Sequence, residues 1–451
     1  MNRGRVAGWA FTTVLALLAL AAGYRAIQRH VNPAKATSPA TTAQAAIAAE
    51  EAHPSFLYGR ITTVDGATYE GRLRWGRGEE AFWGDYFNGA KRENPWVAHL
   101  RPEQLPKERN PFKIFGFELV QRERPVDLGR LFMARFGDLA RIQASGRDVR
   151  VTLKSGTVFD LDRFSASDFD DGVRVWDETR GVADLDSLRI RAIELLSPPR
   201  PGAAPDRLHG TVRTSQGGEF TGFVQWDREK CVGSDELAGG TASGERSMRF
   251  DAIRSIARRS PDSSLVTLLD GREMVLSGAR GVGLGNRGVY VDDPRYGRVL
   301  VSWDAFDRVQ FSTGGNGPAY GDFPPGGPLT GSVTTRDGRR LTGRLVYDLD
   351  ESEITETLDA PSEGVDYTIP FDLIASVVLP RSEEHGAPRA RLTLHGGREL
   401  QLECAGDLGR GNAGMLIFVD HRQRPEYVPW TDVEQVALDR PPAMYPLPGR
   451  R

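Results

Sequence analysis

Apolar and polar residues alternate with a period of two in short segments along most of the chain beyond residue 57. The segments Arg298–Trp303 and Arg391–His395 are short and rich in β-branched or apolar residues, as expected of half-buried strands. Asp65-Gly66 and Asp337-Gly338 lie between such segments, where a primed turn with positive φ at its central residues matches the twist of paired strands. We therefore predict an all-β fold assembled from hairpins.

One template recurs three times with identical spacing. It consists of a strand that begins at a glycine, a turn, and a second strand that contains an internal glycine and ends on an aromatic residue. The opening, internal and aromatic positions of the three copies are Gly59, Gly71 and Trp75; Gly210, Gly222 and Trp226; and Gly331, Gly343 and Tyr347. Glycine inside a strand marks a bend, a bulge or a close backbone approach, and a bent second strand lets a five-stranded sheet close on itself.

A second block, which begins at Phe136, Phe250 and Phe371, is also shared by the three copies. The two halves of each copy resemble one another, because each half ends in an apolar strand with a one-turn motif such as Pro370–Val377. We therefore predict three tandem copies of a two-lobed unit, each lobe a small barrel of about five strands, preceded by one amino-terminal apolar helix.

These patterns and the Pro/Gly-rich stretches between them predict the following organisation. The segments are a signal peptide or membrane anchor (1–24), a flexible Ala/Thr-rich tether (25–56), repeat 1 (57–196) with an aromatic insertion (76–135), a linker (197–207), repeat 2 (208–311), a Gly/Pro linker (312–328), repeat 3 (329–438) and a carboxy-terminal tail (439–451).

Copy three carries a resemblance to a known class of small barrels. Its segments Leu341–Leu345, followed by Asp348, and Ile369–Ile374 resemble the Sm-like and SH3-like class. The resemblance implies the barrel fold. It does not imply RNA binding, because Leu349, Asp350 and Glu351 follow Asp348 where the Sm pattern has Asn, and the closing strand lacks the Arg-Gly pair.

The amino terminus has the pattern of an export signal. Arg3 and Arg5 precede an uncharged stretch, Val6–Tyr24, whose 19 residues would rise roughly 28 Å as a helix, close to the thickness of a bilayer core. The same stretch fits a cleaved signal peptide, with an Ala19–Ala21 cleavage pattern. Both interpretations predict that the remainder is exported to the cell envelope, as a membrane-anchored or periplasmic protein.

Composition and motifs argue against several function classes. A net charge of −3 gives no positive field for nucleic acid, so membrane contact is predicted through the amino-terminal helix only. Two patterns, Gly283–Gly288 and Gly409–Gly414, fit G-x-G-x-x-G, but strand patterns follow them where a nucleotide site needs a helix. The sequence contains no G-x-S-x-G elbow and no H-E-x-x-H pair. We predict a protein that is not an enzyme and has no cofactor.

No metal site is predicted from the spacing of the histidines and cysteines. The acidic residues Asp168, Asp170 and Asp171 replace the glycine loop of the other copies. They are the remaining candidates to bind a divalent cation.

The insertion of copy one is the main departure from the repeat. It places 60 residues between Trp75 and Phe136, whereas copy two has 23 between Trp226 and Phe250. A long aromatic segment on a repeat scaffold either covers a barrel face or forms a recognition surface. Its candidate binding residues are Trp83, Asp85, Tyr86, Asn88 and Trp96.

Two functions follow from these patterns. The first is a non-enzymatic interaction or scaffold protein of the cell envelope, with a protein partner. The alternative is a carbohydrate-binding protein, in which Trp83, Tyr86 and Trp96 would stack on a cell-wall glycan.

Overall fold

The computed structural model describes residues 54–76, 78–104, 107–114, 117–125, 131–164, 169, 171–199, 207–314, 317–381, 388–420 and 422–441, with the backbone alone for 107–125. The predicted signal or anchor 1–24, nearly all of the tether, Asp168, Asp170 and most of the carboxy-terminal tail lie outside these residues. No helix in the described part of the chain has the length and hydropathy to span a bilayer.

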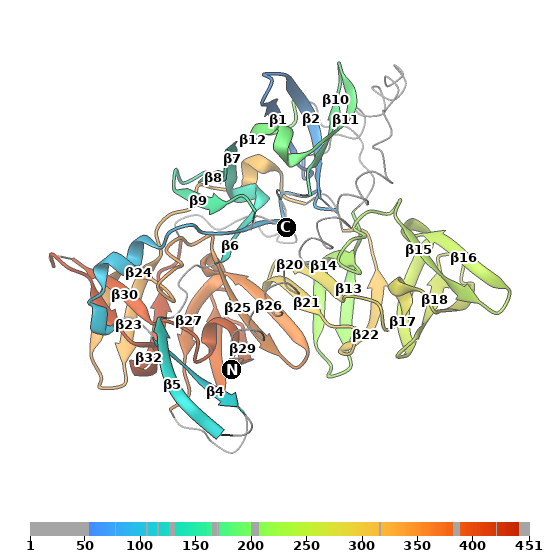
Figure 1. Cartoon of the computed structure of the whole chain (residues 1–451). Coiled ribbons are helices and arrows are strands. Elements are labelled where there is room, and N and C mark those ends of the chain that lie inside the picture. Colours follow the sequence, from blue (N-terminus) through green and yellow to red (C-terminus); the bar gives the residue numbers. More distant parts are fainter. Residues whose placement is uncertain are drawn as a thin grey trace, which may run out of the picture. The chain divides into compact units, whose positions relative to one another are not determined.

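The described residues confirm the all-β prediction. They form strands and short 3₁₀ turns, and none of their helices reaches seven residues. Three large sheets and two two-stranded sheets account for the strands (Figure 1). All the described residues belong to one compact unit.

The first large sheet has the order β11-β10-β2-β1-β12-β7-β8-β9. Its strands are β1 (Tyr58–Thr63), β2 (Thr68–Trp75), β7 (Leu139–Ser145), β8 (Asp148–Leu153), β9 (Val158–Asp162), β10 (Val173–Asp177), β11 (Gly181–Leu185) and β12 (Ile190–Leu195).

The second has the order β16-β15-β19-β18-β17-β22-β13-β14-β20-β21-β26-β25. Its strands are β13 (His209–Thr214), β14 (Glu219–Trp226), β15 (Glu236–Thr241), β16 (Gly244–Arg249), β17 (Ile253–Ser260), β18 (Ser263–Leu268), β19 (Glu273–Ser277), β20 (Val289–Asp293), β21 (Gly297–Val301), β22 (Phe306–Phe311), β25 (Thr357–Ser362) and β26 (Val365–Pro370).

The third has the order β29-β28-β27-β32-β23-β24-β30-β31. Its strands are β23 (Thr330–Thr335), β24 (Arg340–Val346), β27 (Ile374–Val378), β28 (Arg389–Leu394), β29 (Glu399–Glu403), β30 (Met415–Val419), β31 (Glu426–Val428) and β32 (Val433–Leu438).

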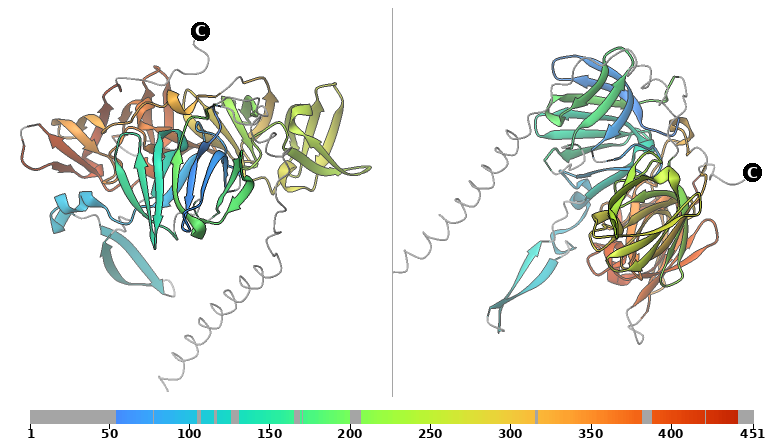
Figure 2. Two further views of the ribbon diagram at one scale, coloured as in Figure 1. Left: turned by 90° about the horizontal axis from the view of Figure 1, so that it is seen from above. Right: turned by 90° about the vertical axis from the view of Figure 1, so that its right-hand side faces the viewer.

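The remaining elements are two small sheets and the 3₁₀ turns. In both views of Figure 2 the β4–β5 hairpin is a two-stranded ribbon separate from the large sheets. The elements are β3 (Tyr86–Ala90) paired with β6 (Leu131–Arg135), β4 (Lys107–Ile114) paired with β5 (Phe117–Pro125), and the turns η1 (Pro95–His99), η2 (Pro102–Gln104), η3 (Phe136–Asp138), η4 (Ser187–Arg189), η5 (Phe250–Ala252), η6 (Arg280–Val282), η7 (Tyr320–Asp322), η8 (Phe371–Leu373), η9 (Gly406–Leu408) and η10 (Trp430–Asp432).

The two halves of each predicted copy exchange strands. In the second sheet, β13 and β14 from the first half pair with β22 and β20 from the second half. Conversely, β18 and β19 from the second half pair with β17 and β15 from the first. Neighbouring strands in this sheet therefore come from both halves of the predicted copy. The physical reason is the tight turn between Ser260 and Ser263, which brings β18 directly back onto β17. The equivalent pairings recur in the first and third sheets.

Large aromatic residues form the centre of each sheet's core. Trp75, Trp226 and Tyr347, the aromatic positions of the template, are all buried. Their ring centroids lie 5.2 Å from Phe136, 5.3 Å from Phe306 and 5.3 Å from Phe371, respectively. The second and third sheets share one continuous core, and β21 pairs directly with β26.

The turns at Asp65-Gly66 and Asp337-Gly338 form hairpins as predicted, but they are not primed turns. Only the glycines have positive φ, +84° at Gly66 and +85° at Gly338, whereas a type I′ turn requires positive φ at both central residues. The amide of Gly66 donates to the carbonyl of Thr63, and the amide of Thr63 donates to that of Ala67. These hydrogen bonds enclose a hairpin loop longer than the two residues of a primed turn. The glycine takes the left-handed conformation that closes this longer loop.

The glycines inside the second strands lie where backbones approach closely, as the sequence predicts. A Cβ atom at Gly71 would lie 1.8 Å from the carbonyl oxygen of Trp176, and one at Gly222 would lie 2.1 Å from that of Asp292. These contacts join strands that are distant in sequence, so the glycines allow the strand exchange between halves.

Gly222→Ala should destabilise the protein by about 2 kcal/mol, because the added methyl group forces β14 and β20 apart. Urea denaturation monitored by tryptophan fluorescence measures the change. Gly396→Ala is the matched control, because a Cβ atom there meets no atom within 4 Å. Equal stability of the two variants would contradict the close approach of β14 and β20 at Gly222.

Candidate binding groove and the segment that builds it

Part of the aromatic insertion is buried among the large sheets. Trp83 is 3% exposed and packs in the core of the first sheet, with its ring centroid 6.4 Å from that of Phe323. Tyr86 is 4% exposed, and the guanidinium of Arg298 lies 5.3 Å from the centre of its ring. Burial raises the pKa of Tyr86. These two rings leave no open face on which a glycan could stack, so they serve to cover the fold.

Asp85 holds a turn and an ion pair. Its Oδ2 accepts hydrogen bonds from the amides of Glu80 and Ala81, both at 2.9 Å. Asp235, directly before β15, and Glu356, directly before β25, accept equivalent pairs of amides, so the arrangement occurs three times in the described part of the chain.

The other carboxylate oxygen of Asp85 joins the insertion to the second sheet. Arg298 donates to Asp85 Oδ1 at 3.0 Å and to Asp292 Oδ1 at 2.9 Å. Burial raises the pKa of Asp292, and the Arg298 guanidinium opposes that shift. The buried cation therefore neutralises one carboxylate from the insertion and one from the second sheet.

Lys91 makes the corresponding connection to the residues just before β25. Its ammonium group lies 2.7 Å from Glu356 Oε1 and 3.1 Å from Asp350 Oδ1, and its side chain is nearly inaccessible. Burial alone would lower the pKa of Lys91, but the carboxylates of Glu356, Asp350 and Glu351 raise it above its ordinary value. These carboxylates therefore hold the Lys91 side chain in a fixed position and anchor the segment that follows it in the chain.

Arg135 is a second buried cation of the insertion. It donates to Asp138 Oδ2 at 2.6 Å and to Asp372 Oδ2 at 3.3 Å. Burial raises the pKa of Asp372 to about 6, against the opposing effect of Arg135.

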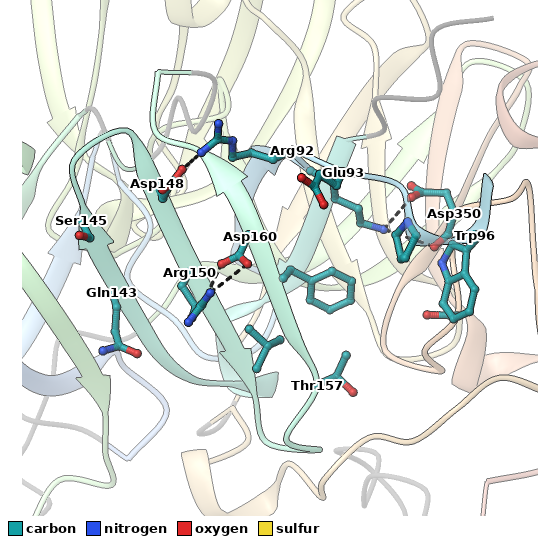
Figure 3. A pocket seen from close by; sticks show the side chains of 15 residues that line it. Arg92, Glu93, Trp96, Gln143, Ser145, Asp148, Arg150, Thr157, Asp160 and Asp350 are labelled. Atoms are coloured by element: carbon teal, nitrogen blue, oxygen red, sulfur yellow. Dashed lines mark hydrogen bonds and ion pairs between the residues drawn. The ribbon is translucent and has the colours of Figure 1, made fainter. Parts of the chain in front are cut away.

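A groove of about 710 Å³ lies between residues 91–96 of the insertion and the sheet formed by β7, β8 and β9 (Figure 3). The floor of the groove contains a row of three side chains from three neighbouring strands, Gln143, Arg150 and Asp160. They lie in a row because Gln143 is paired with Arg150 and Arg150 with Asp160. Asp350 and Ser352, which lie between β24 and β25, also line it. Three chain segments distant in sequence thus line a single space, whose size is that of a small-ligand site.

The charged side chains in the groove are largely neutralised by one another. Arg150 donates to both carboxylate oxygens of Asp160, at 2.8 and 3.1 Å, and Arg92 forms an ion pair with Asp148. These side chains are partly exposed, so they hold donors and acceptors in fixed positions at the surface.

Of the predicted binding residues, Trp96 alone lines this groove. Its amide donates to Asn94 Oδ1 at 3.0 Å, and Asn94 donates to the carbonyl of Leu349 at 2.8 Å. The guanidinium of Arg344 lies 4.9 Å from the centre of the half-buried Trp96 ring. The ring is therefore held in place by Arg344 of β24 and by the contact of Asn94 with Leu349.

Asn88 lies elsewhere, in a second cavity of about 390 Å³ beside acidic residues that precede and follow β25. The structure thus does not bring the five predicted residues together.

Asp171, the described member of the acidic triplet, is exposed and lies beside Gly76. Among the described residues, no group of three histidine, cysteine or acidic side chains has the geometry to hold a metal ion.

The chain matches no protein-family model, and no curated protein or solved structure is detectably similar to it.

The main groove residues Gln143, Arg150 and Asp160 were not predicted from the sequence. Each occupies a polar position in an alternating strand, which is the pattern of any solvated sheet face. A signal was present in the pairing of β8 and β9, because Arg150 and Asp160 face one another across the hairpin and carry opposite charges.

Lys91→Met should lower the free energy of unfolding by about 3 to 5 kcal/mol, because it leaves Glu356 and Asp350 buried without their cation. Arg174→Met is the control, since it removes the exposed ion pair with Asp184 and should cost less than about 1 kcal/mol. Urea titrations of both variants measure the difference. Similar losses would show that Lys91 has no special role.

Asp372 should give a pH-dependent contribution to stability. Its pKa is about 6 in the folded protein and near 3.8 when exposed, so its contribution is present below pH 4 and lost as the pH rises through 6. Relative to Asp372→Asn, the wild type should lose about 2 to 3 kcal/mol over that interval. Unfolding free energies at several pH values test this, and a difference that stays constant would contradict it.

Proposed function

We propose that this chain is a non-enzymatic binding and scaffold protein of the cell envelope, and that the groove is its binding site. One observation carries the proposal. The insertion that interrupts the repeat pattern uses its buried residues to fix the sheets, and its segment 91–96 to form a wall of the groove. The groove, and the buried contacts that join the insertion to the sheets, are thus formed by the same segment of the chain.

The scaffold consists, in this proposal, of three copies of a two-lobed unit, whose lobes are small barrels of the SH3-like class. Its support is the correspondence of the sheet orders: β11-β10-β2-β1-β12-β7-β8-β9 matches, strand for strand, the order of the third sheet and the corresponding part of the second. In all three, a 3₁₀ turn directly precedes a central strand, as η3, η5 and η8 precede β7, β17 and β27.

The placement in the envelope rests on the sequence of residues 1–24, with a basic start and an uncharged apolar stretch. A tether of the composition of 25–56 would leave the folded part free to meet ligands outside the cytoplasm. The partner class predicted first from the sequence is an envelope protein, and a glycan is the second.

A photo-crosslinking residue at Val158 tests the site. Val158 is 49% exposed and lines the groove, whereas Leu188 is 66% exposed, does not line it, and serves as the control position. We expect illumination of intact cells to yield a distinct adduct from position 158 that is absent from position 188. Absence of any adduct at 158, or identical adducts at both positions, would refute the groove as the binding site.

A further inference from the structure

The pairing of charges in the groove indicates the class of ligand. Of the charged side chains that line the groove, Arg92, Arg150 and Lys91 are each bound to a carboxylate, Asp148, Asp160 and Asp350 respectively, and Glu93 adds one further negative charge. An anionic ligand would have to compete with those carboxylates for the cations, and a cationic ligand would have to compete with the cations. The groove is thus chemically suited to an uncharged ligand that both donates and accepts hydrogen bonds.

The hydrogen-bonding groups of the groove lie in a row and are fixed in direction. The two bonds between Arg150 and Asp160 hold both groups across neighbouring strands, which leaves remaining guanidinium hydrogens and carboxylate lone pairs for a ligand. The amide side chain of Gln143 extends the row on the other side of Arg150. Ser145 and Thr157 add hydroxyl groups to the lining.

Apolar groups complete the lining. Trp96 and Pro95 belong to the wall formed by the insertion, and Val158 and Phe159 to β9. The Phe159 ring is held by Phe132, with centroids 4.9 Å apart, and by the Lys91 ammonium 5.0 Å from its centre. An aromatic or aliphatic surface beside a polar row matches a molecule with apolar C–H faces and hydroxyl edges.

We infer that the ligand of the groove is an uncharged oligosaccharide. This inference rests on the proposed function, because it names the ligand class of the same groove. Sugar hydroxyls donate and accept hydrogen bonds without net charge, and sugar rings present C–H faces to Trp96 or Val158. The residues that carry it are Arg150, Asp160 and Gln143, whereas Trp83 and Tyr86 have no part in it because they are buried.

The full-length protein in detergent can be screened against an array of neutral and acidic oligosaccharides, followed by calorimetry with the strongest ligand. Chitotetraose and cellotetraose are the neutral reference probes, and tetragalacturonate is the acidic one. We expect neutral glycans to bind, and their affinity to stay constant when NaCl rises from about 50 to about 500 mM, because no net charge is neutralised.

Two matched variants connect binding to the groove. Arg150→Ala and Arg174→Ala each remove an exposed cross-strand arginine that is held by two bonds to an aspartate, but only Arg150 lines the groove. Arg150→Ala should weaken binding about tenfold or more, as expected for a lost charge-assisted hydrogen bond. Arg174→Ala should leave the affinity unchanged.

Three results would overturn the inference: no neutral glycan bound on the array, a preference for acidic glycans with salt-sensitive affinity, or equal affinity of the Arg150→Ala variant and the wild type. A protein adduct at position 158 without glycan binding would also overturn it, while leaving the groove as the binding site. Loss of both the adduct and glycan binding would remove the proposed function as well.

Discussion

Buried cations that must be neutralised are the constraint on which the arrangement of the sheets depends. Arg298, Lys91 and Arg135 are each largely withdrawn from water, and each is paired with carboxylates contributed by different parts of the chain. A single buried charge without its partner costs several kcal/mol, so these groups tolerate only relative positions of the sheets that bring the partners together. Apolar packing supplies stability to each sheet, and the ion pairs select how the sheets meet.

The insertion shows how one segment can be structural and expose a surface at the same time. Its buried rings lie against Phe323 and Arg298, and the residues that follow reach Glu356 and Leu349. Lys91 is buried, and its neighbour Arg92 is exposed in the groove. The direction of the chain at this point decides which side chains are available to a ligand.

The sequence was sufficient for the strands and for the positions of the turns at Gly66 and Gly338, though not for the type of turn, because alternation and glycine placement are local properties. The internal glycines at 71 and 222 even indicated the close approach of backbones correctly. Local patterns did not reveal which half of a copy pairs with which, since β14 has the same alternation whether its neighbour is β15 or β20. Trp83 and Trp96 illustrate the same limit for the site. Both are aromatic residues in one polar insertion, and only the distant residues that surround each ring make one buried and the other part of the groove.

Strand exchange between the halves of a copy has a consequence for the order in which the chain acquires structure. β13 has β14 beside it at once, but its other neighbour, β22, ends at Phe311, about a hundred residues further along the chain. Closure of a loop of this length precedes any gain from the contacts that it brings, so such topologies fold slowly. A growing polypeptide that has not yet delivered β22 lacks the strand that pairs with both β13 and β17. The middle of this sheet is therefore assembled only after the intervening strands β14 to β21 have been synthesised.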